Sequence, residues 1–143
     1  MTARALASAL LVAALATGCS DYEGGSKDDV VADGNAICEA SGATVMPALE
    51  ELQDEGIPTT GELRGFAGDV AVPALQKRVY GLRRLDPPSD DRKTIDEMIR
   101  ATEKGIDDIR ADPTQLVDGD PFLQANAEAA AYGLTSCVLG FEP

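Results

Sequence analysis

Residues 95–110 read IDEMIRATEKGIDDIR and form the most regular pattern in the chain. Their apolar side chains recur at steps of three and four residues, which places them on one face of a helix. Charged side chains fill the other positions, so one side of this helix can pack on a core while the other faces water. We therefore predict an amphipathic helix whose inner face is formed by Ile95, Met98, Ile99, Thr102, Ile106 and Ile109.

Helical patterns also lie on both sides of this segment. Upstream, one helical region spans residues 28–54 and a second spans residues 59–85. The second opens with Thr59, whose hydroxyl can cap the helix while the carboxylate of Glu62 reaches back to the Thr59 backbone. Downstream, an Asp-Pro pair is a helix start signal and opens a last helical region, residues 120–140.

Prolines and glycines mark the breaks in these regions. Gly42 and Pro47 interrupt the first region, and Pro73 interrupts the second, because proline lacks a backbone donor and clashes with the preceding turn. We expect kinks there, or a first region divided into two short helices. Ser89 or Asp90 is expected to cap the third helix.

Four helical regions with short connections predict an all-α domain over residues 28–143. The expected architecture is a four-helix up-and-down bundle with some helices kinked at proline. The composition agrees with this class, since the chain has no Trp and only 4% aromatic residues. A core filled mainly by small aliphatic residues favours closely packed helices over a sheet.

The first 18 residues have the composition of a secretory signal peptide. Arg4 precedes an apolar run from Ala5 to Ala16, and small residues follow it. The run is too short for a transmembrane helix, which needs about 20 apolar residues. Residues 19–27 are polar and contain glycine, as a flexible tether does.

Ala16-Thr17-Gly18 directly precede Cys19, and this arrangement resembles the lipobox of bacterial lipoproteins. The resemblance implies that residues 1–18 are removed and that Cys19, carrying diacylglyceryl and palmitate groups, becomes the first residue of the mature protein. The protein would then be extracytoplasmic and anchored to the cell membrane by lipid. Ordinary secretory cleavage after Ala16 is the alternative, and it would leave a secreted protein with an unmodified Cys19 thiol.

The chain has three cysteines, and an odd number in an exported protein needs an explanation. Lipid on Cys19 would leave Cys38 and Cys137 as a pair in a compartment that permits disulfides. An up-and-down order of four helices also brings the start of the first helix near the end of the last. We therefore predict a Cys38–Cys137 disulfide that clasps the domain, with two buried free thiols as the alternative.

Three short motifs resemble a group of small helical secreted proteins from high-GC bacteria with no characterised activity. The motifs are Asn35-Ala36-Ile37-Cys38, Leu85-Asp86-Pro87-Pro88 and Tyr132-Gly133-Leu134-Thr135-Ser136-Cys137. The resemblance implies a disulfide-clasped helical domain and no particular activity.

Two pairs of similar residues are candidates for a site. Tyr80-Gly81 and Tyr132-Gly133 could place two tyrosines around a ligand. The interpretation we favour is that the glycines permit close helix crossings and the tyrosines lie at the rim of the core. Asn35 and Asn126 could form a polar pair inside the bundle, but exposed or capping positions are favoured.

Charge and residue types exclude several classes of function. The formal net charge of −13 repels phosphate backbones, so nucleic acid is not an expected partner. The chain contains no histidine, which excludes Ser-His-Asp and Cys-His catalysis. Asp118-Gly119-Asp120 and the acids at positions 28, 29 and 33 lack the spacing of a calcium loop. We expect no catalytic residue, no metal site and no cofactor.

These features predict a non-enzymatic, membrane-anchored interaction or accessory module whose partner is an unknown envelope protein. The alternative is a carrier of an apolar ligand between the helices, because kinks at Pro47 and Pro73 could leave a cavity. A hydrolase that uses carboxylates is a third hypothesis, since 25 residues are acidic and none is distinguished from the others. A filled core, an apolar cavity or two converging buried carboxylates would separate the three.

Overall fold

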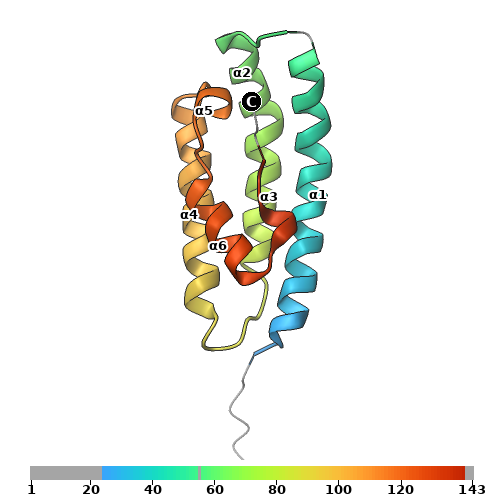
Figure 1. Ribbon diagram of the computed structural model, residues 1–143, viewed down its shortest axis with the longest axis vertical. Coiled ribbons are helices and arrows are strands. Elements are labelled where there is room, and N and C mark those ends of the chain that lie inside the picture. The colour runs from blue at the N-terminus through green and yellow to red at the C-terminus, as the bar shows by residue number, and fades with distance from the viewer. Residues whose placement is uncertain (1–23, 55, 141–143) are drawn as a thin grey trace, which may run out of the picture.

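The computed structural model describes residues 24–54 and 56–140, and that part of the chain contains helices and no strand. The predicted all-α class is therefore confirmed. Three long rods lie side by side, and a shorter helix lies over them (Figure 1). The first rod is α1 (Lys27–Asp54), the second combines α2 (Thr60–Phe66), the π-helical η1 (Ala67–Ala71) and α3 (Val72–Leu82), and the third is α4 (Arg92–Ala111).

The four-helix up-and-down bundle is not confirmed, because the last region is much shorter than expected. After the single turn α5 (Gln115–Asp118), α6 (Leu123–Tyr132) has only 10 residues, and the 3-10 turn η2 (Thr135–Cys137) follows. Gly133 ends α6 with a positive φ of 105°, a conformation that favours glycine. The expected start at residue 120 and the expected end at residue 140 are both wrong.

The first rod is one continuous helix, so of the two expected outcomes at Gly42 and Pro47, a kink or a division into two short helices, the division is wrong. Pro47 lies inside α1 and is exposed to solvent. Val45 and Leu49, on either side of it, are 0% and 3% exposed, so the helix keeps its packing across the proline. Water can hydrate the carbonyl that loses its helical partner at an exposed proline.

The second rod contains the irregularity predicted at Pro73, which takes the form of a π-helical turn. The N–H of Val72 donates to the carbonyl of Ala67, five residues back. One extra residue in the turn is a known way for a helix to continue past a proline. At the start of this rod the predicted capping box is present, with Thr59 N donating to Glu62 Oε2 at 2.7 Å. These hydrogen bonds from Thr59 lower the pKa of Glu62.

The third rod matches its prediction most closely. All six residues of the predicted inner face of α4 are at most 5% exposed. The expected cap at Ser89 or Asp90 is wrong, because α4 begins after Asp91, whose side chain makes no capping hydrogen bond. Instead, Asp91 Oδ2 accepts from the hydroxyl of Tyr132 on α6, at 2.9 Å.

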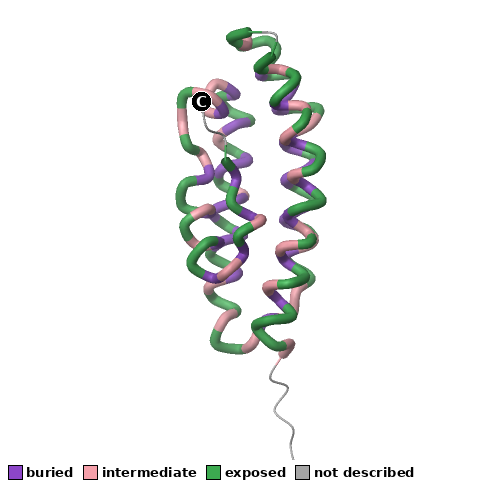
Figure 2. Tube along the Cα trace, turned by 45° about the vertical axis from the view of Figure 1, so that its right-hand side comes forward, coloured by how far each residue is buried: buried purple, intermediate pink, exposed green. Residues whose placement is uncertain are grey.

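Buried positions lie along the facing sides of the rods and under α6, as Figure 2 shows. They form one continuous apolar core. Phe122, at the start of α6, is fully buried, and the ring lies against Gly105 of α4. None of the described helices is long and apolar enough to cross a membrane.

Candidate functional site: the α1–α3 groove and the adjoining disulfide

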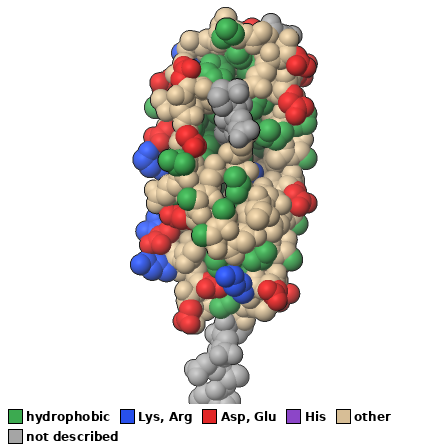
Figure 3. Space-filling model, viewed as in Figure 1, with side chains coloured by type: hydrophobic (Ala, Val, Ile, Leu, Met, Phe, Trp, Pro, Cys, Tyr) green, Lys and Arg blue, Asp and Glu red, His purple; other side chains and the backbone are tan. Residues whose placement is uncertain are grey.

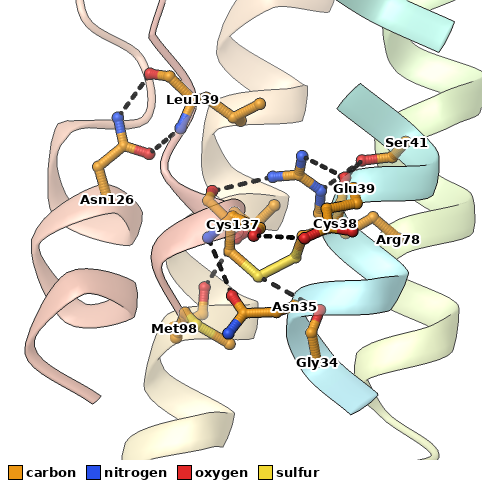
Figure 4. Close-up of a disulfide and its surroundings, with 12 residues drawn as sticks. Gly34, Asn35, Cys38, Glu39, Ser41, Arg78, Met98, Asn126, Cys137 and Leu139 are labelled. Carbon is orange, nitrogen blue, oxygen red and sulfur yellow. Dashed lines mark hydrogen bonds between the residues drawn. A yellow bond between two sulfur atoms is a disulfide. The ribbon is translucent and has the colours of Figure 1, made fainter. Parts of the chain in front are cut away.

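The predicted pair Cys38 and Cys137 lies at disulfide distance, with Cα atoms 4.9 Å apart (Figure 4). Cys38 lies on α1, as expected, but Cys137 lies on η2 and not on a long fourth helix. Because α6 ends at Gly133, the chain turns back toward α1 and brings Cys137 to it. The bridge therefore connects α1 to the C-terminal segment, which we define as residues 133–140.

The two asparagines also hold the C-terminal segment (Figure 4), and they are neither paired with each other nor exposed. Asn35 on α1 accepts from Ser136 N at 2.9 Å and donates to Gly133 O at 3.3 Å. Asn126 on α6 accepts from Leu139 N at 2.8 Å and donates to Leu139 O at 2.9 Å. Each side-chain amide thus hydrogen-bonds to one backbone N–H and one backbone carbonyl of the C-terminal segment, in place of the partners that a helix or strand would provide.

Arg78 of α3 is the residue of this region that sequence reasoning missed. It is only 3% exposed, and its guanidinium reaches α1 and the C-terminal segment. Nε donates to Ser41 Oγ at 2.6 Å, Nη1 to the Cys137 carbonyl at 3.0 Å and Nη2 to the Cys38 carbonyl at 3.5 Å. Burial lowers the pKa of Arg78 to about 10, which still leaves it charged at neutral pH.

A groove of about 820 Å³ runs between α1 and α3, beside Arg78. Its walls are mainly apolar, and none of the C-terminal segment lines it. Val70 and Pro73 belong to the π-helical turn and the residues just after it, so the irregular part of the second rod forms one end of the groove. The apolar lining includes Ala36, Ile37, Ala40, Val70, Pro73 and Ala74.

The groove carries an excess of positive charge in a strongly acidic protein. The charged residues that line it are three cations, Lys77, Arg78 and Arg84, and two acids, Asp33 and Asp69. The net charge of the lining is therefore 3 − 2 = +1, in a chain whose net charge is −13. None of the three cations forms an ion pair with a described carboxylate, whereas five of the other basic side chains do. The guanidinium of Arg84 lies 5.7 Å from the ring centroid of Tyr80.

The two Tyr-Gly pairs do not meet in one site. Tyr80 is 64% exposed at the edge of the groove, whereas Tyr132, the last residue of α6, is buried and does not line the groove. Gly81 does permit a close helix crossing, because a Cβ there would lie 2.8 Å from Ile37 Cγ2 on α1. Gly133 has a different role, since it ends α6 with a positive φ.

The other sequence-predicted residues contribute no reactive cluster. The acids at positions 28, 29, 33, 118 and 120 are exposed, and no group of three or more potential metal ligands occurs among the described residues. One carboxylate oxygen, Glu128 Oε2, is buried without a hydrogen bond, but Glu128 does not line the groove. Cys19 lies outside the described residues.

The chemistry that this arrangement offers is binding. Ser41 accepts a hydrogen bond from Arg78 and has no neighbouring base among its described hydrogen-bond partners, so nothing activates its hydroxyl as a nucleophile. The groove combines apolar walls with a few polar groups and has the size of a typical small-molecule site.

Comparisons of the chain with protein-family models, curated proteins and solved structures found no significant match.

Proposed function

We propose that this protein is a lipid-anchored extracytoplasmic module that carries an apolar ligand in the groove between α1 and α3. The single observation that carries the proposal is the groove itself, about 820 Å³ in volume with mainly apolar walls. Sites for small ligands are usually concave, largely apolar and provided with a few polar groups, and the groove has these three properties.

The proposed module is not an enzyme. A hydrolase that uses two carboxylates would need a pair that converges in a cleft. Asp33 and Asp69 both line the groove, but they lie on different helices. Asp33 is on α1 next to Gly34, which approaches Leu85, whereas Asp69 is in the π-helical turn η1 at the other end of that wall. Both are also exposed, so neither has the burial that tunes a catalytic acid.

The proposed anchor is Cys19. Support comes from the signal-peptide and lipobox pattern of residues 1–19 and from the disulfide, which accounts for the other two cysteines. The C-terminal segment contacts α1 at Asn35 and Cys38, in the first half of that helix.

The anchor is tested by mass spectrometry of the mature protein from the native envelope. Lipidation at Cys19 predicts a blocked N-terminus that is heavier by the lipid, and partition of the protein into detergent. Cys19→Ala should leave the precursor uncut or release the protein, while Ser20→Ala should change neither property. Unmodified mature protein that begins at Thr17 would contradict the anchor.

The groove is tested by extracting the purified protein with organic solvent and identifying the apolar molecules that leave it. Ala40→Trp should reduce the extracted ligand strongly, because Ala40 is exposed on the groove wall and an indole there would fill the space. Ala127→Trp, at an exposed position of α6, is the matched control and should retain the ligand. Equal ligand content in both variants would contradict the proposed carrier.

A second candidate is an accessory module that binds an envelope protein. Two large exposed residues favour it: Ile57, between α1 and α2, is 98% exposed, and Tyr80 is 64% exposed. Tyrosine is enriched where proteins bind each other. A pull-down from the native envelope separates the candidates, because Ile57→Ser, at a position that does not line the groove, should lose a protein partner but keep a ligand seated between the helices.

A further inference from the structure

We propose that the ligand of the α1–α3 groove is a single-chain fatty acid, with its alkyl chain on the apolar walls and its carboxylate between Lys77 and Arg84. This inference rests on the proposed carrier function and specifies its ligand. It follows from three observations: the charge of the groove, its size and its place relative to the start of the helical domain.

The charge of the groove indicates an anionic ligand. Lys77 and Arg84 are exposed, line the same groove and form no ion pair with any described acid. Arg78 adds a fixed positive charge beneath them, although its own donors point to Ser41 and to two backbone carbonyls. In a chain of net charge −13, a groove that keeps three cations without acidic partners is complementary to an anion.

The length of the groove fits one extended alkyl chain. Along α1 it extends from Asp33 to Thr44, which at 1.5 Å per residue is a length of about 17 Å. An extended chain can lie lengthwise in such a groove and contact both helices.

The place of the groove indicates a membrane source for the ligand. One end lies at Asp33 and Leu85, only a few residues after α1 begins at Lys27. A lipid on Cys19, eight residues before Lys27, would hold this end beside the bilayer, where single-chain lipids are found. The net negative charge of the rest of the surface would not attract anionic headgroups, so the fatty acid would be recognised by the groove alone. Acidic side chains lie along both edges of the face seen in Figure 3.

The test is calorimetric titration of the mature chain carrying Cys19→Ala, so that no lipid of its own competes. The probes are dodecanoate and dodecan-1-ol, which share one chain and differ in the charge of the head group, both below micelle-forming concentrations. We expect dodecanoate to bind roughly tenfold more tightly, a difference of about 1.4 kcal/mol that two partly exposed ion pairs can contribute together. Added salt should reduce that advantage.

Matched variants assign the advantage to the groove. Lys77→Gln with Arg84→Gln should bring the two affinities to within about twofold of each other. Arg64→Gln with Arg100→Gln is the control, because both arginines are exposed, form no ion pair with a described acid and do not line the groove. This control removes the same charge and should keep the preference for dodecanoate. Ala36→Trp and Ala40→Trp, both at exposed positions, should abolish binding of both probes while circular dichroism stays unchanged.

The outcomes separate this inference from the proposed function. Equal binding of the two probes, with no effect of the Lys77 and Arg84 variants, would overturn the inference that the ligand is a fatty acid. It would still agree with the proposed function as a carrier of an apolar ligand. Failure of both probes to bind would overturn the carrier as well. Binding of an acidic amphipathic peptide that Ala40→Trp blocks, with no binding of dodecanoate, would assign the groove to a protein partner and overturn the inference.

Discussion

Arg78 places a cation at a helix position where the sequence pattern calls for an apolar residue. It lies on the same face as Leu75 and Leu82, three and four residues away, and those two are fully buried. Lysine and arginine are almost never buried without partners. An arginine in register with a buried stripe was therefore the signal in the sequence, but its partners could not be foreseen, because they are carbonyls on α1 and on the C-terminal segment.

The first prediction concerns the geometry of that guanidinium. Arg78→Lys should lower the free energy of unfolding by about 1–3 kcal/mol, because one ammonium cannot reach three acceptors and leaves buried oxygens unsatisfied. Chemical denaturation measures the change. Arg64→Lys, at an exposed position of α2, should stay within about 0.5 kcal/mol of the wild type. An equally small effect at Arg78 would mean that charge alone is needed there.

The second prediction concerns Tyr132 at alkaline pH. Burial, followed by the hydrogen bond to Asp91 and the charge of that carboxylate, raises the pKa of Tyr132 to about 12. Because the folded pKa lies above the ordinary value of about 10, the stabilisation is fully present below pH ~10 and is lost as the pH rises through the folded pKa. Ultraviolet titration of the wild type and of Tyr132→Phe should differ by one phenol that ionises late. Asp91→Asn should move that ionisation to lower pH, and no movement would exclude the carboxylate as a cause.

At the scale of elements, the periodicity of apolar residues predicted which face of a helix is buried, but not where the last helix ends. The inner face of α4 was predicted residue by residue, because an amphipathic helix records its buried side in its own sequence. The end of α6 was not predicted, because Gly133 and Gly140 are equivalent as local stop signals. Tertiary contacts distinguish the two glycines. Asn35 and Asn126 hydrogen-bond to backbone groups from Gly133 onward, and these bonds replace the helical ones that would continue α6.

The third prediction concerns the contact of α4 with the start of α6. A Cβ on Gly105 would come within 2.4 Å of the Phe122 ring and 2.7 Å of the Pro121 carbonyl, and a backbone atom cannot easily move aside. Gly105→Ala should therefore destabilise the protein by about 1–3 kcal/mol.

The matched control for Gly105 is Gly65→Ala in α2, where nothing lies within 4 Å of the added Cβ. This variant should stabilise the protein by about 0.5–1 kcal/mol, because alanine is the better helix former. Thermal unfolding of the two variants, followed by circular dichroism, should shift in opposite directions. A stabilising Gly105→Ala would mean that α6 can move away from α4 at little cost.

For the whole molecule, the sequence predicted the all-α class and the Cys38–Cys137 pair, but the route to that pair differs from the prediction. A long fourth helix was expected to bring Cys137 to α1. In the structure the C-terminal segment does so after a ten-residue α6. The groove was foreseen only as a possible cavity at the prolines. Its position depends on how α1 and α3 cross at the close contact of Gly81 with Ile37. The sequence predicted a close crossing at Gly81, but not which residue of which helix it would meet.

The last prediction joins the disulfide to the C-terminal segment. Replacement of Cys38 and Cys137 by Ser opens a link between positions 99 residues apart. In the chain-entropy model such a link stabilises the folded state by up to about 4–5 kcal/mol, and measured values are often smaller. The thermal midpoint should fall clearly. Most helix content should remain below the transition, because the buried face of α4 and its contacts do not depend on the bridge.

Hydrogen exchange should locate the loss in the C-terminal segment. Without the bridge, the amides of Ser136 and Leu139 depend only on the side chains of Asn35 and Asn126, so their protection should fall well below that of α4. Cys19→Ala is the control and should leave their protection unchanged. If Ser136 and Leu139 stay as protected as α4 in the double Ser variant, the asparagines and Arg78 hold the segment without the disulfide. The bridge would then serve only to restrict the unfolded chain.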